Sequence, residues 1–225
     1  MRAAAVVFGA VGTLFEPEPL RSRLTALGLP NRELEVWLSR IDAGGAGLSA
    51  AGTFCSFKEM ATSVLTATIA ELGNRPDATR VQEIVGGFEV LPACKDLKNS
   101  LVQLSELGTR AAVLTRLSIE TGRTLLMHAG VLNQVAQVFS IDEVSRWKPS
   151  SEPYLHAVKG LGLTPAQVAF VSANPWDVTG AKAAGLFGIL LQRRGGHRPA
   201  AMPAPDLTIA GLAELAQVGA KFDPV

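Results

Sequence analysis

Short apolar segments recur along the chain, and within them apolar residues are continuous rather than alternating with polar ones. The clearest are AAAVVF (3–8), RAAVLT (110–115), VAQVFS (135–140), QVAFVS (167–172) and FGILLQ (187–192), with a weaker one in PDLTIA (205–210). This pattern is typical of strands buried on both faces, as in a parallel sheet. Helical patterns separate most of these segments, over residues 95–107, 118–129, 150–161 and 176–184. The alternation predicts right-handed βαβ crossovers and an α/β fold with a doubly wound parallel sheet.

One long region interrupts this alternation. Between residues 20 and 88 the periodicity is helical throughout, and no strand pattern occurs. Ser56 is a suitable N-cap, and Gly73 a suitable residue just past the C-terminus, for the helix between them. The sequence therefore predicts two subdomains: a helical cap inserted at residues 16–89, and an α/β core at residues 1–15 and 90–225.

The composition is that of a globular protein. Of the 225 residues, 48% are apolar and 18% are charged. The 21 basic and 20 acidic residues give a net charge of +1, so charge offers no reason to expect nucleic acid or an anionic membrane as a partner. No apolar run reaches the roughly 20 residues that a membrane-spanning helix needs. Cys55 and Cys94 have no metal-ligand spacing, and we expect reduced thiols in a cytoplasmic protein.

The N-terminal segment MRAAAVVFGAVGTLF loosely resembles a signal peptide. It has one basic residue and no small-residue cleavage site, so we interpret it as a buried first strand.

Ligands of such a sheet bind beyond the carboxyl ends of its strands, so residues that directly follow a strand are candidates for a site. These are residues 9–13, 115–118, 148 and 172–177. The hydroxyl of Thr13 and the amides of its turn suit an anion, but an ordinary tight turn is an alternative. Thr115 can instead be a helix N-cap, and Lys148 can lie in solvent.

The segment SANPWD (172–177) is more distinctive. Ser172, Asn174 and Asp177 crowd together after a fully apolar strand, at the point where a helix begins. One polar residue there would be a helix cap, but three at the mouth of a parallel sheet indicate a site. Asp177 has the chemistry to orient Lys148 or to take a proton.

Four segments, in this order, resemble the motifs of the haloacid dehalogenase superfamily of hydrolases, and most closely those of the bacterial 2-haloacid dehalogenases. They are VVFGAVGTLF (6–15), VLTRLS (113–118), KPSSEPY (148–154) and VSANPWDVTGA (171–181). The last is the most specific, because few other families place Ser, Asn, Trp and Asp in this way. The resemblance covers essentially the whole chain. It implies a Rossmann-like core, with the helical region as the family's cap.

In that family, an aspartate at the end of the first strand attacks C2 of the substrate and displaces halide with inversion, and water then hydrolyses the ester. The resemblance implies that seven residues position the aspartate, the water and the substrate carboxylate: Thr13, Thr115, Lys148, Tyr154, Ser172, Asn174 and Asp177. Phosphoryl-transferring members need Mg²⁺ and carry a second aspartate, at the position that is Val11 here. We therefore expect no metal and no cofactor.

The aspartate position of the first motif is Gly9, and the two residues that follow are apolar. No ester can form at a glycine, and the expected loss of turnover by the family's mechanism is roughly 10⁴- to 10⁶-fold. Three accounts are open. The enzyme uses altered chemistry, in which Asp177 and Lys148 activate a water or move a proton. It is an inactive relative that binds a small carboxylate or a protein. Or the chain is an altered form of an ordinary hydrolase. We favour the first, because unused polar residues at a buried mouth would cost stability.

A second departure is Arg116. The family usually has Asn at this position and takes a substrate-binding arginine from the cap, for which Arg40 is the candidate. Arg116 is suited to bind the substrate carboxylate instead, and the alternative is a surface arginine at a helix start. We expect a small 2-substituted carboxylic acid, held by Thr115, Arg116 and Asn174. The resemblance also implies a homodimer.

Two further features have ordinary interpretations. The stretch QRRGGHR (192–198) predicts a solvated loop, because it is basic and rich in glycine. His128, His156 and His197 share no metal spacing, so we expect each to be structural or exposed.

Overall fold

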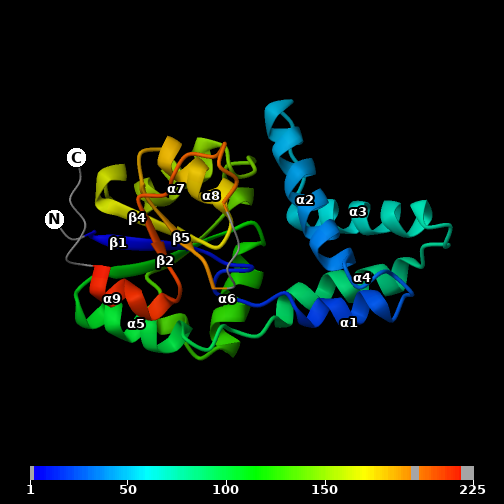
Figure 1. Ribbon diagram of the computed structural model, residues 1–225, viewed down its shortest axis with the longest axis horizontal. Helices are drawn as coiled ribbons and strands as arrows, with labels where there is room; N and C mark the ends of the chain where they lie inside the picture. The colour runs from blue at the N-terminus through cyan, green and yellow to red at the C-terminus, as the bar shows by residue number, and fades with distance from the viewer. Residues whose placement is uncertain (1–2, 194–197, 219–225) are drawn as a thin grey trace.

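The computed structural model describes residues 3–193 and 198–218. Within these residues the sheet has six strands in the order β3-β2-β1-β4-β5-β6, and all neighbouring strands are parallel (Figure 1). The strands are β1 (Ala5–Gly9), β2 (Arg110–Thr115), β3 (Gln137–Ser140), β4 (Val168–Ser172), β5 (Phe187–Leu191) and β6 (Leu207–Ile209). Each lies within a predicted apolar segment or extends one residue past it. The predicted α/β fold with a parallel sheet is therefore confirmed.

Both faces of this sheet are buried, which explains the continuous apolar runs. Successive residues of a strand point to opposite faces. In β1, Val6 and Phe8 belong to one buried cluster, and Ala5 and Val7 belong to the other. A strand in this position needs apolar side chains at every residue.

Two pairs of helices supply the covering layers. Helices α5 (Leu97–Glu106) and α6 (Ile119–His128) pack on the first face, and α7 (Ser151–Gly160) and α8 (Pro175–Ala183) on the second (Figure 1). These four helices match the four predicted ones. The short helix α9 (Leu215–Val218) lies beside α5. One-turn 3-10 helices complete the described chain: η1 (Gly87–Val90), η2 (Leu132–Gln134), η3 (Ile141–Glu143), η4 (Pro165–Gln167) and η5 (Leu212–Glu214).

Between β1 and β2 the chain forms the helical insert, residues 19–90. It contains α1 (Pro19–Thr25), α2 (Glu33–Ala50), α3 (Phe57–Glu71), α4 (Ala78–Gly86) and η1, and it stands to one side of the sheet (Figure 1). The predicted cap of α3 is present, because Ser56 and Glu59 form a reciprocal capping box. Gly73 follows α3 with a φ of +77°, a backbone conformation that favours glycine.

The chain leaves the sheet and returns to it through two adjacent backbone segments. Phe15 and Ala93 form an antiparallel bridge. The Glu16 amide donates to the Pro92 carbonyl at 2.9 Å, and the Cys94 amide donates to the Leu14 carbonyl at 2.8 Å. The insert is thus joined to the core through a hydrogen-bonded pair of segments.

Trp147 of the core makes a second set of contacts with the insert. Its backbone amide donates to Ser49 Oγ of α2 at 2.7 Å, and its indole N–H donates to the Cys55 carbonyl at 3.0 Å. The ring is 2% exposed and lies against Gly45 of α2. These contacts fix α2 above the carboxyl ends of the strands.

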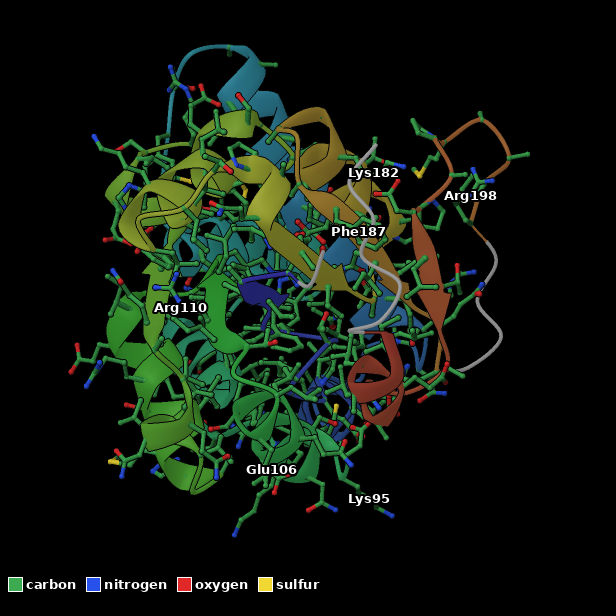
Figure 2. All side chains as sticks on the ribbon, turned by 90° about the vertical axis from the view of Figure 1, so that its left-hand side faces the viewer. Lys95, Glu106, Arg110, Lys182, Phe187 and Arg198 are labelled. Carbon is green, nitrogen blue, oxygen red and sulfur yellow. The ribbon has the colours of Figure 1, made fainter. Side chains whose placement is uncertain are left out.

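The opposite end of the sheet, where the strands begin, carries no part of the insert. Figure 2 shows this end, with Arg110 and Phe187, the first residues of β2 and β5. Cys55 and Cys94 form no disulfide. In the part of the chain that the structure describes, no helix is both long enough and apolar enough to span a membrane.

Candidate active site

The parallel register brings the four candidate segments together. β1 lies between β2 and β4, so Gly9 pairs with Leu114 of β2, and Phe8 pairs with Val171 of β4. The residues that follow these strands therefore meet at one edge of the sheet, beneath α2 of the insert.

Asp177 is the centre of this edge. Its Oδ2 accepts hydrogen bonds from Lys148 Nζ at 2.8 Å and from Ser172 Oγ at 2.9 Å. Its Oδ1 accepts one from the Tyr154 hydroxyl at 2.6 Å. Asp177 is 2% exposed and lies in the first turn of α8, where the positive end of the helix dipole favours a carboxylate. Four of the predicted site residues thus form one buried network, which we call the Asp177 cluster.

Lys148 is part of the buried interior. It is 6% exposed, and its Nζ also donates to the Leu114 carbonyl at 3.4 Å and lies 5.4 Å from the centre of the Phe170 ring. Burial lowers the pKa of Lys148, the Asp177 carboxylate opposes that shift, and the charge of Arg116 adds to it. The alternative of a solvated lysine is therefore wrong.

Tyr154 is fully buried and acts as a hydrogen-bond donor. Burial and the Asp177 carboxylate raise the pKa of Tyr154 well above its ordinary value, so its hydroxyl stays protonated at neutral pH. The hydroxyl also donates to the Asp177 backbone carbonyl at 3.1 Å. Tyr154 holds the carboxylate in place from α7.

Gly9 opens directly onto this cluster. A Cβ at position 9 would lie 3.3 Å from Ser172 Oγ, 3.3 Å from Thr13 Oγ1 and 3.4 Å from Asp177 Oδ2. All three atoms are polar oxygens, so a side chain here would point into the hydrogen-bonded network. The tip of the central strand therefore contributes backbone alone to the site.

Thr13 is held by protein partners on both sides. Its Oγ1 accepts the Ala173 amide at 3.0 Å, and its own amide donates to the Ala10 carbonyl at 3.2 Å. The amides of Leu14 and Phe15 also donate to the Ala10 carbonyl. The tight-turn alternative describes this segment correctly, because these amides are already bonded within the turn.

Thr115 and Asn174 lie at the edges of the same region. Thr115 Oγ1 accepts the Leu117 amide at 3.0 Å, and the N-cap of α6 is Ser118, so Thr115 is not that cap. Asn174 is the N-cap residue of α8, but its side chain makes no capping hydrogen bond. The backbone N–H of Asn174 donates to Ser172 Oγ at 3.2 Å. Asn174 lies between two residues of the cluster in sequence and is only half-buried, whereas Thr115 is buried at the end of β2.

Arg116 is buried at the boundary between the core and the insert. It is 8% exposed, forms an ion pair with Asp42 of α2, and lies 5.4 Å from the centre of the Phe57 ring of α3. Burial lowers the pKa of Arg116 to about 10, against the opposing charge of Asp177, so the guanidinium is charged at neutral pH. The surface-arginine alternative is wrong.

Arg40 does not join this group. Its guanidinium donates to Glu71 at 2.7 Å and to Thr68 at 3.0 Å, both on α3 of the insert. Asp42, two residues further along α2, is the residue that reaches the core, because two helical residues differ by about 200° in direction. Sequence reasoning missed Asp42. The one available signal is its place beside AGGAG (43–47), small residues that allow a close approach to a neighbour.

The remaining polar candidates lie elsewhere. His156 contacts Glu143 at 3.3 Å, and His128 ends α6, whereas His197 lies outside the described residues. Arg193 is half-buried and pairs with Asp96 at 2.6 Å, so the predicted solvated loop is wrong at that residue, and its positions 194–197 lie outside the described residues. Among residues 3–193 and 198–218, no group of three or more His, Cys, Asp or Glu is arranged to hold a metal ion.

Two hollows are lined by residues that follow the strands of the sheet. One, of about 440 Å³, is between the insert and α6, and its walls include Phe57, Leu117 and Ser118, next to Arg116. The other, of about 350 Å³, is on the side of β4 and β5, and its walls include Gly12 and Ala173. The Asp177 cluster lies at the level of the strand ends, and none of its residues is part of the walls of these two hollows.

Comparison with known proteins agrees with this arrangement. The family model described as haloacid dehalogenase-like hydrolase matches residues 3–185. The (S)-2-haloacid dehalogenase of Xanthobacter autotrophicus is 29% identical over 181 residues, which are 79% of this chain and 70% of that protein. The (S)-2-haloacid dehalogenase of Pseudomonas sp. (strain YL) is 27% identical over 207 residues, which are 92% of this chain and 85% of that protein.

A solved structure of a related enzyme has the same fold as this protein. The L-2-haloacid dehalogenase of Xanthobacter autotrophicus, with chloropropionic acid covalently bound, has a TM-score of 0.86 and 25% sequence identity to this protein. The superposition covers 96% of this chain and 97% of that one. Since the family model spans most of the sequence, the chain belongs to the haloacid dehalogenase-like hydrolases.

Proposed function

We propose that this protein acts on a small 2-substituted carboxylic acid without forming an ester at the end of β1. The single observation that carries the proposal is the intact Asp177 cluster around a glycine. Every position that the family resemblance assigns to this cluster keeps a polar residue, whereas position 9 has no side chain. The solved relative with chloropropionic acid bound supports the same class of substrate.

The space at Gly9 suits a water molecule. Three oxygens, from Thr13, Ser172 and Asp177, surround the point where a Cβ would stand, and a water would lie beyond that point, further from the Gly9 Cα and toward these oxygens. Three polar partners are the usual number for a water held inside a protein. The proposed reaction therefore uses this water in place of an aspartate side chain.

Asp177 is the proposed base. As the water oxygen bonds to C2 of the substrate, Asp177 Oδ2 takes one of its protons, and the bond from C2 to the leaving group breaks with its electron pair on that group. Lys148 donates a hydrogen bond to the same carboxylate oxygen at 2.8 Å and so orients it before the reaction. Tyr154 fixes the other carboxylate oxygen so that Oδ2 faces Gly9. The substrate carboxylate would lie toward Arg116. The charge of Arg116 is close enough to the cluster to lower the pKa of Lys148.

One observation favours a second candidate, a binding protein without turnover. Both Asp177 oxygens and the Lys148 ammonium already have partners within the protein. A network that is satisfied internally is stable without any reaction. In this case the protein would bind a carboxylic acid beside the cluster and leave it unchanged.

The test is an assay of halide release and product acid with 2-halo, 2-hydroxy and cyclic 2-amino carboxylic acids. It compares the wild-type protein with Gly9→Asp and Asp177→Asn. The proposal expects turnover by the wild type and its loss in Asp177→Asn, which keeps the shape of the base and removes its charge. Turnover by Gly9→Asp alone would instead identify an ordinary hydrolase without its nucleophile. Binding without turnover in all three would support the second candidate.

A further inference from the structure

The ion pair between Arg116 and Asp42 joins the two parts of the molecule. Arg116 follows β2 in the core, and Asp42 lies 74 residues earlier, on α2 of the insert. The Arg116 side chain is 9% exposed and that of Asp42 is 18% exposed. The buried guanidinium of Arg116 is therefore already paired with a carboxylate of this chain.

In the part of the chain that the structure describes, no second carboxylate is paired with Arg116. Within the described residues, Asp42 is its one hydrogen-bond partner, and Phe57 lies against the guanidinium at 5.4 Å. A guanidinium presents its donors as a planar fork, which a carboxylate fits with two parallel hydrogen bonds. An arginine buried to this degree needs an anion, because a lone buried charge is costly.

Asp42 and the proposed substrate carry the same chemical group. A carboxylate from a small molecule fits the fork as the Asp42 carboxylate does, and both cannot occupy the same donors. Asp42 is tethered nearby at an effective concentration of about millimolar or more, so it lowers the apparent affinity for the incoming group. Because it is partly exposed, Asp42 can turn to water when it is displaced.

We propose that Asp42 is an internal stand-in for the ligand carboxylate, and that ligand binding at Arg116 displaces it and releases α2 from this contact. The ligand class in this statement rests on the proposed function. Trp147 keeps its own contacts with Ser49 and Cys55 near the end of α2. These contacts stay in place at the C-terminal end of α2 while the segment around Asp42 moves. Entry of the acid is thus coupled to the position of the insert.

The test measures propionate binding by titration calorimetry to the wild type, Asp42→Asn and Glu71→Gln. Asp42→Asn keeps the shape of the side chain and removes its charge, so propionate affinity should rise roughly tenfold or more. Glu71→Gln is the matched control, since it removes the charge partner of Arg40 inside the insert, and its affinity should equal that of the wild type. Asp42→Asn combined with Arg116→Met should lose the gain, which places the propionate at Arg116.

A second measurement needs no variant. Hydrogen exchange of the α2 amides around Asp42 should speed up when propionate saturates the wild type, while amides next to Glu71 stay unchanged. The proposal is overturned if Asp42→Asn binds propionate no better than the wild type, or if exchange in α2 does not change. Turnover is a separate readout. A gain in propionate affinity with no turnover of any 2-substituted acid would support the displacement of Asp42 and reject the proposed catalysis.

Discussion

Trp147 of the core and Gly45 of α2 are packed so closely that no side chain fits between them. A Cβ at position 45 would overlap the indole ring, whereas a Cβ at Gly47, on the same helix, would meet no atom within 4 Å. At this one point, the insert meets the core through a helix position that has no side chain. Gly45 sets the distance between α2 and the strand ends below it.

The first prediction compares alanine at these two glycines. Gly45→Ala should destabilise the protein by about 1–3 kcal/mol, because either the indole or α2 must move. Gly47→Ala should stabilise it by about 0.5–1 kcal/mol, because alanine favours a helix more than glycine does. Urea unfolding gives both values, and Trp fluorescence reports the displaced ring. Equal effects of the two substitutions would contradict the close contact.

The second prediction concerns the buried pair of Lys148 and Asp177. Lys148→Met should cost about 3–5 kcal/mol, because it leaves the Asp177 carboxylate buried without its charged partner. The double variant with Asp177→Asn should lose much less than the sum of the two single changes, because the amide carries no charge to compensate. A double-mutant cycle in urea measures this coupling. Strictly additive losses would show that the two charges do not depend on each other.

A third prediction compares two glycines that border the cluster. Gly9→Ala should change stability by less than about 1 kcal/mol, because its Cβ would be in slightly tight contact, at 3.3–3.4 Å. Gly180→Ala should cost more, because its Cβ would lie 2.6 Å from the Pro149 carbonyl and 2.8 Å from the Tyr154 hydroxyl. Thermal unfolding ranks the two variants. A severe loss at position 9 would mean that the site tolerates no side chain there.

The fourth prediction is a pH dependence at Asp96. Burial raises its pKa, but the Arg193 ion pair at 2.6 Å and the Leu212 amide at 2.8 Å more than offset this, so the pKa is lower than usual. The folded state therefore favours the ionised form. The stabilisation is complete above the ordinary pKa of about 4 and is lost as the pH falls through the lower folded value.

Asp96→Asn is the variant that measures this contribution. At pH 7 it should lower the free energy of unfolding by about 1–3 kcal/mol, because a charge-assisted hydrogen-bond acceptor is lost. The difference from the wild type should shrink as the pH falls below about 4. Urea titrations between pH 2.5 and 7 follow this difference. A difference that stays constant over the whole range would show that the charge of Asp96 is not responsible.

The sheet was predictable because burial on both faces leaves a strong local pattern. All five residues of β1 are buried, as are all five of β4, so each reads as a continuous apolar run. The polar residues after β4 were also predictable as a site, since Ser172 and Asp177 are five residues apart and meet at 2.9 Å. In both cases the information lies within a few consecutive residues.

The contact between Arg116 and Asp42 was not predictable in this way. The two residues are separated by 74 positions, and they meet only because α2 docks on the strand ends in one orientation. Arg40 and Asp42 are two positions apart on α2 and point in directions about 200° apart, so the sequence alone did not show which of them faces the core. Lys148 was ambiguous for a similar reason, because its burial depends on helices and strands distant in sequence.

Because Phe15 and Ala93 pair where the insert begins and ends, the insert is a unit that can be exchanged as a whole. Its two ends emerge from neighbouring, hydrogen-bonded segments, so another set of helices can be joined there without changing the strand order or register. Residues that the insert presents to the core, such as Asp42, can then vary independently of the Asp177 cluster. A lineage that carries this fold can explore new ligands in one module while the other module keeps its chemistry.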